Sequence, residues 1–138
     1  MTALKKAGAV IIALFVEVVL IAVLEYMGHQ LYPIELSMED ILEQGPDAIP
    51  IIHLISVLIA YVIASFFSGM VLAKLSAKYW NSTGLYILGV IGTLFAAINC
   101  FTIPHPTWFV FGALLSFIPF TLLGGQLVLR RKQRSTSV

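Results

Sequence analysis

Glu17 is the residue best placed to do chemistry, because it stands in the middle of a long apolar stretch. A charge at the centre of a membrane span costs about 2.5–3.5 kcal/mol on insertion scales, so this side chain must face protein and find a partner or a proton. A protonated, hydrogen-bonded carboxyl is expected, because no Lys or Arg lies at that depth. Two interpretations stay open: a neutral carboxyl that ties helices together, and a proton or cation site. The candidate partners at the same depth are Tyr61, Ser65, Thr93, Ser116 and Thr121.

A second group of polar residues falls at one end of the apolar stretches. Glu25 and His29 are four residues apart and therefore share a helix face. His53 and His105 lie at the ends of later stretches, and Asn99 is expected about one turn deeper. Three imidazoles and a carboxylate can bind an ion such as Zn²⁺, titrate together near neutral pH, or form structural hydrogen bonds. The sequence leaves all three readings open.

Four apolar stretches must position these residues, at about 7–27, 51–73, 84–103 and 107–129. Each is close to the roughly 20 residues that a helix needs to cross a hydrocarbon core of about 30 Å. Backbone groups in lipid must be bonded internally, so helices are expected. With 59% hydrophobic and 11% charged residues, the sequence predicts an all-α membrane protein. It is expected to form one domain, 1–138, with four transmembrane helices in an antiparallel up-down bundle.

Charge placement predicts the orientation of this bundle. All eight Lys and Arg residues lie before the first stretch, between the second and third, or after the fourth. The positive-inside rule places both termini in the cytoplasm, with 28–50 as an outer loop and 130–138 as a cytoplasmic tail that is expected to fray. The basic residues are too scattered for a nucleic-acid groove. An aromatic belt is expected from Tyr26, Tyr32 and Trp108 at the outer interface and from Tyr79 and Trp80 at the inner one.

A short amphipathic helix is predicted inside the outer loop. Ser37 is a candidate N-cap, and Glu39 and Asp40 follow it in the first turn. Gly45 and Pro46 are typical of a helix end. The helix is expected to lie as a lid on the bundle, held by Ile34, Ile41 and Leu42.

Small residues recur at helical spacing in the later stretches. They allow close approach of helices where lipid supplies no hydrophobic drive for association. This pattern indicates packing within one chain or, alternatively, the seam of a homo-oligomer. Pro119 is expected to kink the fourth helix. The helix-packing positions are Ser56, Ala60, Ala64 and Ser68 in the second stretch, Gly89 and Gly92 in the third, and Gly112 in the fourth.

Two motifs resemble an uncharacterised group of small four-helix bacterial integral membrane proteins. They are EYMGHQLYP at 25–33 and PHPTWF at 104–109. The resemblance covers most of the chain and implies the fold and a bacterial inner membrane, but no activity. Small multidrug-resistance transporters also carry an acid in the middle of their first helix, as Glu17 is here. The long outer loop and the complete charge bias depart from the dual orientation of those transporters, and the bias equally opposes the fluoride-channel family.

The leading functional interpretation is a non-enzymatic packing or partner protein of the inner membrane. No nucleophile–base pair or phosphate loop can be assembled, and the single cysteine, Cys100, lies in an apolar run. Such a protein needs no cofactor and contacts the bilayer, acting alone, as a homo-oligomer or with a membrane protein partner. The alternative is a small proton- or cation-linked transporter or channel using Glu17, with the Glu25–histidine group as its outer gate. A third interpretation is a metal-dependent membrane enzyme with ligands Glu25, His29, His53 and His105.

Overall fold

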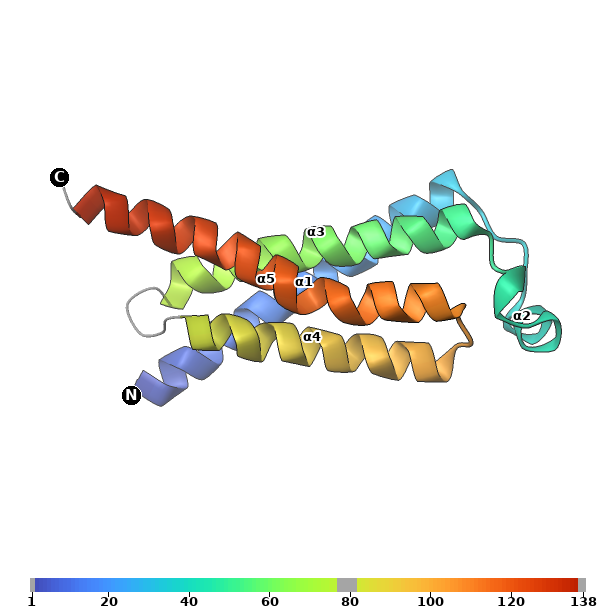
Figure 1. The fold of residues 1–138 in the computed structure, drawn as a ribbon, viewed down its shortest axis with the longest axis horizontal. Coiled ribbons are helices and arrows are strands. Elements are labelled where there is room, and N and C mark those ends of the chain that lie inside the picture. Colours follow the sequence, from blue (N-terminus) through green and yellow to red (C-terminus); the bar gives the residue numbers. More distant parts are fainter. Residues whose placement is uncertain (1, 77–81, 137–138) are drawn as a thin grey trace.

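Four long helices run side by side in the computed structural model, which describes residues 2–76 and 82–136 (Figure 1). Within this part of the chain, four helices are long and apolar enough to cross a membrane. The predicted all-α bundle with a short helix between the first two spans is therefore confirmed. The elements are α1 (Thr2–Leu31), α2 (Met38–Gln44), a 3₁₀ turn (Pro46–Ala48), α3 (Ile51–Ser76), α4 (Ser82–Thr102) and α5 (Thr107–Thr136).

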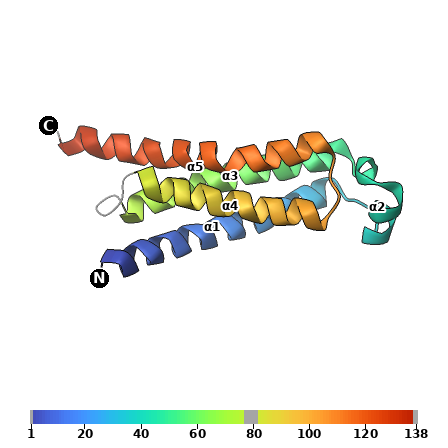
Figure 2. The same cartoon turned by 60° about the horizontal axis from the view of Figure 1, so that its bottom comes forward.

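The long helices alternate in direction, so the start of α1 and the end of α5 lie opposite the end that carries α2 (Figure 2). We call the latter the α2 end. Both terminal helices are longer than predicted, since α1 begins at Thr2 and α5 continues to Thr136. The expectation of a frayed tail is wrong up to that residue. Hydropathy marks where lipid contact stops, whereas Arg, Lys and Gln continue a helix readily in water. The predicted interface residues Tyr79 and Trp80 lie outside the described residues.

The small helix α2 begins and ends as predicted. Ser37 Oγ accepts a hydrogen bond from the Asp40 backbone N–H at 3.1 Å, and Asp40 Oδ2 accepts one from the Ser37 N–H at 2.8 Å. These bonds form a capping box. Gly45, at φ 88°, ends the helix by donating its N–H to the Ile41 carbonyl at 3.0 Å. Hydrogen bonds from the Ser37 hydroxyl and backbone hold the pKa of the Asp40 carboxyl below its ordinary value.

One face of this loop packs onto the bundle. Ile41 is 9% exposed and joins a buried cluster that includes Leu54 and Phe109. Ile34 packs against the same cluster, as expected. Leu42 does not, because its side chain is 63% exposed. Leu42 follows Ile41 directly, and a helix turns by about 100° per residue, so the two cannot share one face.

The tightest packing lies between α3 and α5. A Cβ atom at Gly69 would collide with the Thr121 carbonyl oxygen, and one at Gly124 would collide with the Phe66 carbonyl oxygen. The two backbones therefore touch, and glycine is required on both sides of this α3–α5 seam. Gly69 was not among the predicted packing positions, although it directly follows Ser68.

The predicted small-residue positions lie at contacts within the chain. Ala60, Ala64 and Ser68 are buried along α3. A Cβ at Gly89 would lie 2.9 Å from Ile118 Cα, and one at Gly112 would lie 3.0 Å from Leu58 Cδ1. Ser56 is partly buried and lies opposite Gly28 of α1, where an added Cβ would lie 2.9 Å from its Oγ.

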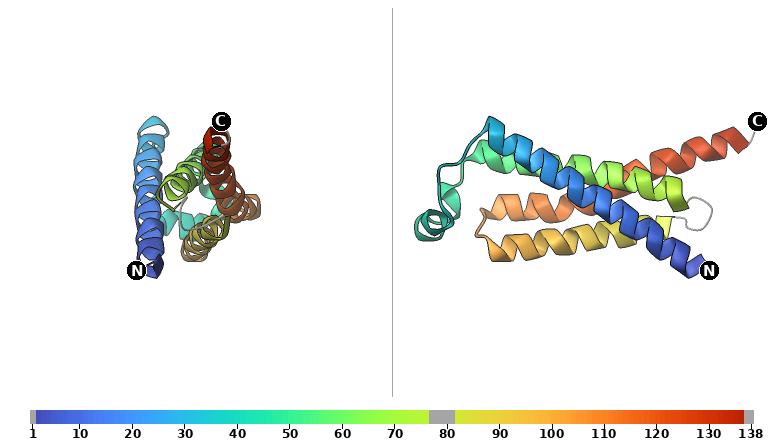
Figure 3. Two further views of the ribbon diagram at one scale, coloured as in Figure 1. Left: turned by 90° about the vertical axis from the view of Figure 1, so that its left-hand side faces the viewer. Right: turned by 180° about the vertical axis from the view of Figure 1, so that it is seen from behind.

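The other side of the bundle is looser. α1 packs along α3, contacts α4 only sparsely and stays away from α5, as the end-on view shows (Figure 3). α5 contains Pro119 and changes direction near its middle (Figures 1 and 3), as expected where a proline removes a backbone hydrogen bond. All four long helices expose large apolar side chains, among them Phe15, Ile59, Leu94 and Leu115. Such a surface is typical of contact with lipid.

Candidate functional site

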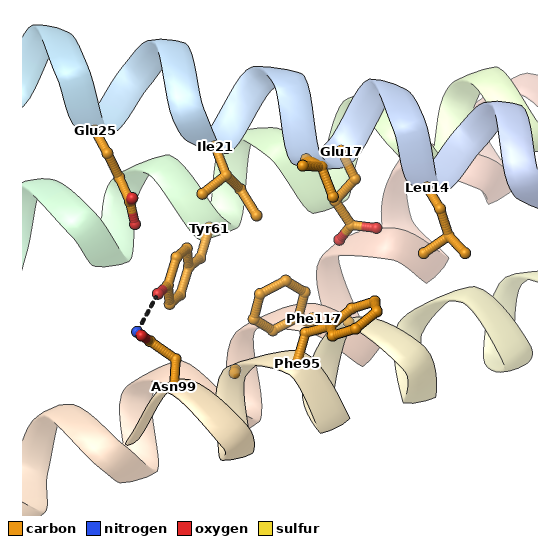
Figure 4. Close-up of a pocket in the computed structure, with 11 residues that line it drawn as sticks. Leu14, Glu17, Ile21, Glu25, Tyr61, Phe95, Asn99 and Phe117 are labelled. Atoms are coloured by element: carbon orange, nitrogen blue, oxygen red, sulfur yellow. Dashed lines mark hydrogen bonds between the residues drawn. The ribbon is translucent and has the colours of Figure 1, made fainter. Parts of the chain in front are cut away.

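The loose side of the bundle holds a cavity of about 270 Å³ between α1 and α4, which we call the lateral cleft (Figure 4). Glu17 and Glu25 of α1 line it, and the side chains of Tyr61 and Asn99 face them (Figure 4). Val18 and Phe95 also line the cleft, although they are 55% and 56% exposed. They therefore form the rim of an opening between α1 and α4 that faces sideways. Its remaining lining residues are Leu14, Ile21, Gly92, Ala96 and Phe117.

Glu17 is buried in this cleft with few partners. The side chain is 2% exposed, and its Oε1 accepts a hydrogen bond from the Ser65 hydroxyl at 3.3 Å. The same hydroxyl donates to the Tyr61 carbonyl at 2.7 Å. A serine has one proton to give, so the longer bond to Glu17 is the weaker one. Glu17 Oε2 is buried with no hydrogen-bond partner, so the carboxyl keeps an unused binding atom.

A glycine of α4 makes room for this carboxyl. A Cβ atom at Gly92 would lie 3.1 Å from Glu17 Oε1 and would collide with the Phe117 ring. The sequence predicted Gly92 as a helix-packing residue. Its position shows a second consequence, which is that α4 presents bare backbone where the acid and the ring need space.

Of the residues expected at the depth of Glu17, Ser65 contacts it and Tyr61 lines the same cleft. Thr93 donates to the Gly89 carbonyl at 2.9 Å, and Ser116 to the Ala113 carbonyl at 2.8 Å. Both bonds lie within their own helices, and neither residue lines the cleft. Thr121 is buried and its hydroxyl has no partner. Depth along the membrane follows from the sequence, but the rotation of each helix about its axis does not.

A larger cavity of about 580 Å³, the α2-end cavity, adjoins the lateral cleft. Met38 and Ile41 line it from α2, which thus helps to cover the polar residues. The structure brings the whole predicted outer group to this one cavity. Its members Glu25, His29, His53, Asn99 and His105 all line it.

The histidines at this cavity do not converge as metal ligands. The rings of His29 and His53 meet edge to face with centroids 6.0 Å apart. His105 stacks on Phe109, and its Nδ1 lies 2.6 Å from the Ile103 carbonyl oxygen, to which it donates. Burial lowers the pKa of His105, and the bond to Ile103 opposes this. Among the described residues, no three His, Cys, Asp or Glu side chains are grouped as a metal ion requires. The metal-enzyme interpretation therefore lacks its ligand set.

Glu25 and Asn99 line both cavities and mark the place where they meet. Asn99 Nδ2 donates to the Tyr61 hydroxyl at 3.2 Å across this boundary (Figure 4). The sequence analysis grouped Tyr61 with Glu17 and Asn99 with the outer histidines. It therefore did not predict the contact between Tyr61 and Asn99. A signal was available, because Asn99 follows Gly92 and Ala96 by seven and three residues and thus shares their helix face. The rings of Phe95 and Phe117 were also missed.

No family model, curated protein or solved structure matches this chain. The resemblance to a group of small bacterial membrane proteins therefore stays a prediction. The class of the protein follows instead from its four long apolar helices, their apolar outer surface and their packing as a bundle. The chain is a multi-pass membrane protein with four candidate spans in its described part.

Proposed function

We propose that this protein is a small transporter that binds a proton or a cation at Glu17. The observation that carries the proposal is the position of this carboxyl. It is almost completely buried, its Oε2 has no partner, and it lines a cleft that adjoins the α2-end cavity at Glu25 and Asn99. Polar side chains thus follow one another from the α2 end to the middle of the bundle.

The energetics of burial favour this function over a purely structural role. An unpaired carboxylate away from water costs several kcal/mol, so Glu17 must take up a proton or a positive charge. None of the described residues that line the lateral cleft is a Lys or Arg. A carboxyl that only tied helices together would be expected to use both oxygens in short hydrogen bonds. Glu17 instead has one long bond, its Oε2 has no partner, and the residue lines a cavity.

The packing interpretation draws support from the α3–α5 seam. That seam requires no acid and no cleft, however, and neither Gly69 nor Gly124 lines the cleft. The transporter proposal accounts for the cleft, and the seam then joins the two helices against which α1 and α4 pack.

The test is proton movement in proteoliposomes that contain a trapped pH-sensitive dye. A panel of inorganic and small organic monovalent cations is offered outside, under an imposed pH gradient. Wild-type protein is expected to couple proton movement to at least one cation, and Glu17→Gln to abolish it, because an amide cannot carry a proton or a charge. Glu43→Gln, which removes an exposed loop acid, is the matched control and should retain activity. Equal coupled flux in Glu17→Gln and wild type, or none in wild type, would overturn the proposal.

We also propose that both termini face the cytoplasm, on the basis of the one-sided basic residues. Cysteines placed at Glu43 and at Ser135, in a Cys100→Ala background, should react with an impermeant maleimide from opposite sides. In intact cells only the cysteine at position 43 should be labelled. Labelling of both from outside would show dual orientation.

A further inference from the structure

We propose that the lateral cleft binds a small lipophilic organic cation, with Glu17 as its counter-charge and with entry from the lipid. This inference rests on the proposed function and names the substrate class of the same site. Three features of the cleft lead to it: the direction of its opening, the chemistry of its walls and its size.

The cleft opens toward lipid rather than only toward water. Its rim residues Val18 and Phe95 are more than half exposed, and they stand on helices that contact each other sparsely. Neighbouring exposed residues on both helices are large and apolar, such as Phe15 and Leu94. A molecule that partitions into the bilayer therefore reaches Glu17 without crossing the α2-end cavity.

The walls suit a cation that carries an apolar body. Phe95 and Phe117 lie across the cleft from Glu17 (Figure 4), and Tyr61 stands next to Phe117 with ring centroids 5.2 Å apart. Aromatic faces attract organic cations, and the attraction is stronger where water is excluded from the contact. Leu14 and Ile21 add aliphatic surface on α1.

Other ligands satisfy only part of this site. A bare inorganic cation needs a shell of oxygen ligands to replace its water, as the six to eight oxygens around Ca²⁺ illustrate. The lateral cleft offers few oxygens and mostly apolar contacts. A neutral hydrocarbon would fill the apolar part but leave Glu17 Oε2 without a partner. An organic cation satisfies the carboxyl and the walls together.

The volume limits the ligand to a small molecule. The cleft holds about 270 Å³, just below the range of about 300–1,000 Å³ found for typical ligand pockets. A single ring with a quaternary ammonium group is therefore a suitable probe. Benzyltrimethylammonium has this form, and neopentylbenzene is its uncharged carbon isostere.

Binding of this cation is coupled to a proton. The cation approaches a protonated Glu17, the carboxyl releases its proton to solvent, and the carboxylate pairs with the ammonium group, so charge balances. The other titratable groups that line the lateral cleft are Glu25 of α1 and Tyr61 of α3, and the lining residues on α4 and α5 contribute none. Affinity is therefore expected to rise with pH, because protons compete with the cation.

Calorimetry on the full chain in lipid nanodiscs tests this inference, with empty nanodiscs subtracted. Wild-type protein should bind benzyltrimethylammonium and should keep it in the presence of neopentylbenzene. Binding should also release protons, which is measured by comparing the heat of binding in two buffers with different heats of ionisation. Glu17→Gln should weaken binding by about thirtyfold or more, as removal of one partner of a buried charge pair does. Glu43→Gln should bind as wild type does.

A second variant leaves both acids of the cleft, Glu17 and Glu25, in place. Phe95→Leu keeps an apolar rim but removes a ring, and it should weaken binding by about threefold to tenfold through the lost cation–π contact. Unchanged affinity in both Glu17→Gln and Phe95→Leu, displacement by neopentylbenzene, or no binding to wild type would overturn the inference. If binding fails while coupled proton flux persists, the substrate class alone is wrong. If the probe binds but no flux occurs, the proposed transport is wrong.

Discussion

Glycine residues shape both the α3–α5 seam and the lateral cleft, but with opposite results. At the seam, Gly69 and Gly124 let two backbones touch, and no space remains for a side chain. At the cleft, Gly92 also removes a side chain, but the space is taken by the Glu17 carboxyl and the Phe117 ring. A glycine in a membrane helix therefore marks either closest contact or room for a functional group, and the opposing helix decides which.

The difference also separates stability from function. α3 and α5 pack backbone against backbone, whereas α1 packs mainly against α3 and borders the cleft. Substitutions at the seam are expected to change the free energy of unfolding. Substitutions in the cleft are expected to change binding with little effect on folding.

The largest effect is expected at the seam, for Gly124→Leu. Even the first added carbon would meet the Phe66 carbonyl, so the helices must separate, at a cost of about 3 kcal/mol. Gly8→Leu in α1 is the matched control, because nothing lies within 4 Å of a Cβ there. Thermal unfolding in detergent measures both. Equal stability of the two variants would mean that the seam is not closed.

An intermediate effect is expected at the α2 end, where a short helix helps to cover the larger cavity. Ser37→Ala removes the N-cap of α2 and should lower local stability by about 1 kcal/mol, seen as faster amide exchange in 38–44.

The capping box also makes α2 sensitive to acid. The pKa of Asp40 is lowered from an ordinary 3.8 by its bonds to Ser37, so the carboxylate stabilises the helix at neutral pH. This contribution to stability is fully present above pH 3.8 and is lost as the pH falls through the lowered pKa that Asp40 has in the folded protein. Exchange in α2, corrected for intrinsic rates, should therefore stay constant from neutral pH to about pH 4 and accelerate below it. Asp40→Asn should abolish that change, and a persistent acid response would assign it to another group.

The smallest effect on stability is expected in the cleft, for Glu17→Gln. The amide retains hydrogen-bonding capacity, and only one long bond, from Ser65, is at stake. We expect the free energy of unfolding to change by less than about 1 kcal/mol, and the proposed transport to be lost. Failure of this variant to fold would contradict the comparison, because it would imply an ionised carboxylate paired with a cation.

The sequence by itself determined the features that are local or depend only on position along the chain. Runs of apolar residues located the four spans, and Ser37 with Asp40 and Gly45 located α2, because capping involves neighbours in sequence. The occurrence of a buried acid in the first span also followed from Glu17 alone. The depth at which each polar residue lies is a matter of counting along a helix of constant rise.

Tertiary structure decided how the helices are rotated and which pairs meet. It placed Ser65 against Glu17 while Thr93 and Ser116 turned to their own backbones, and it joined Tyr61 to Asn99. Hydropathy cannot supply this information, because the lipid and the interior of the bundle are both apolar. A membrane helix therefore has little amphipathic signal. Rotation is set instead by the close approach of backbones at the glycines of α3 and α5, and that approach leaves α1 standing away from α4 with the cleft between them.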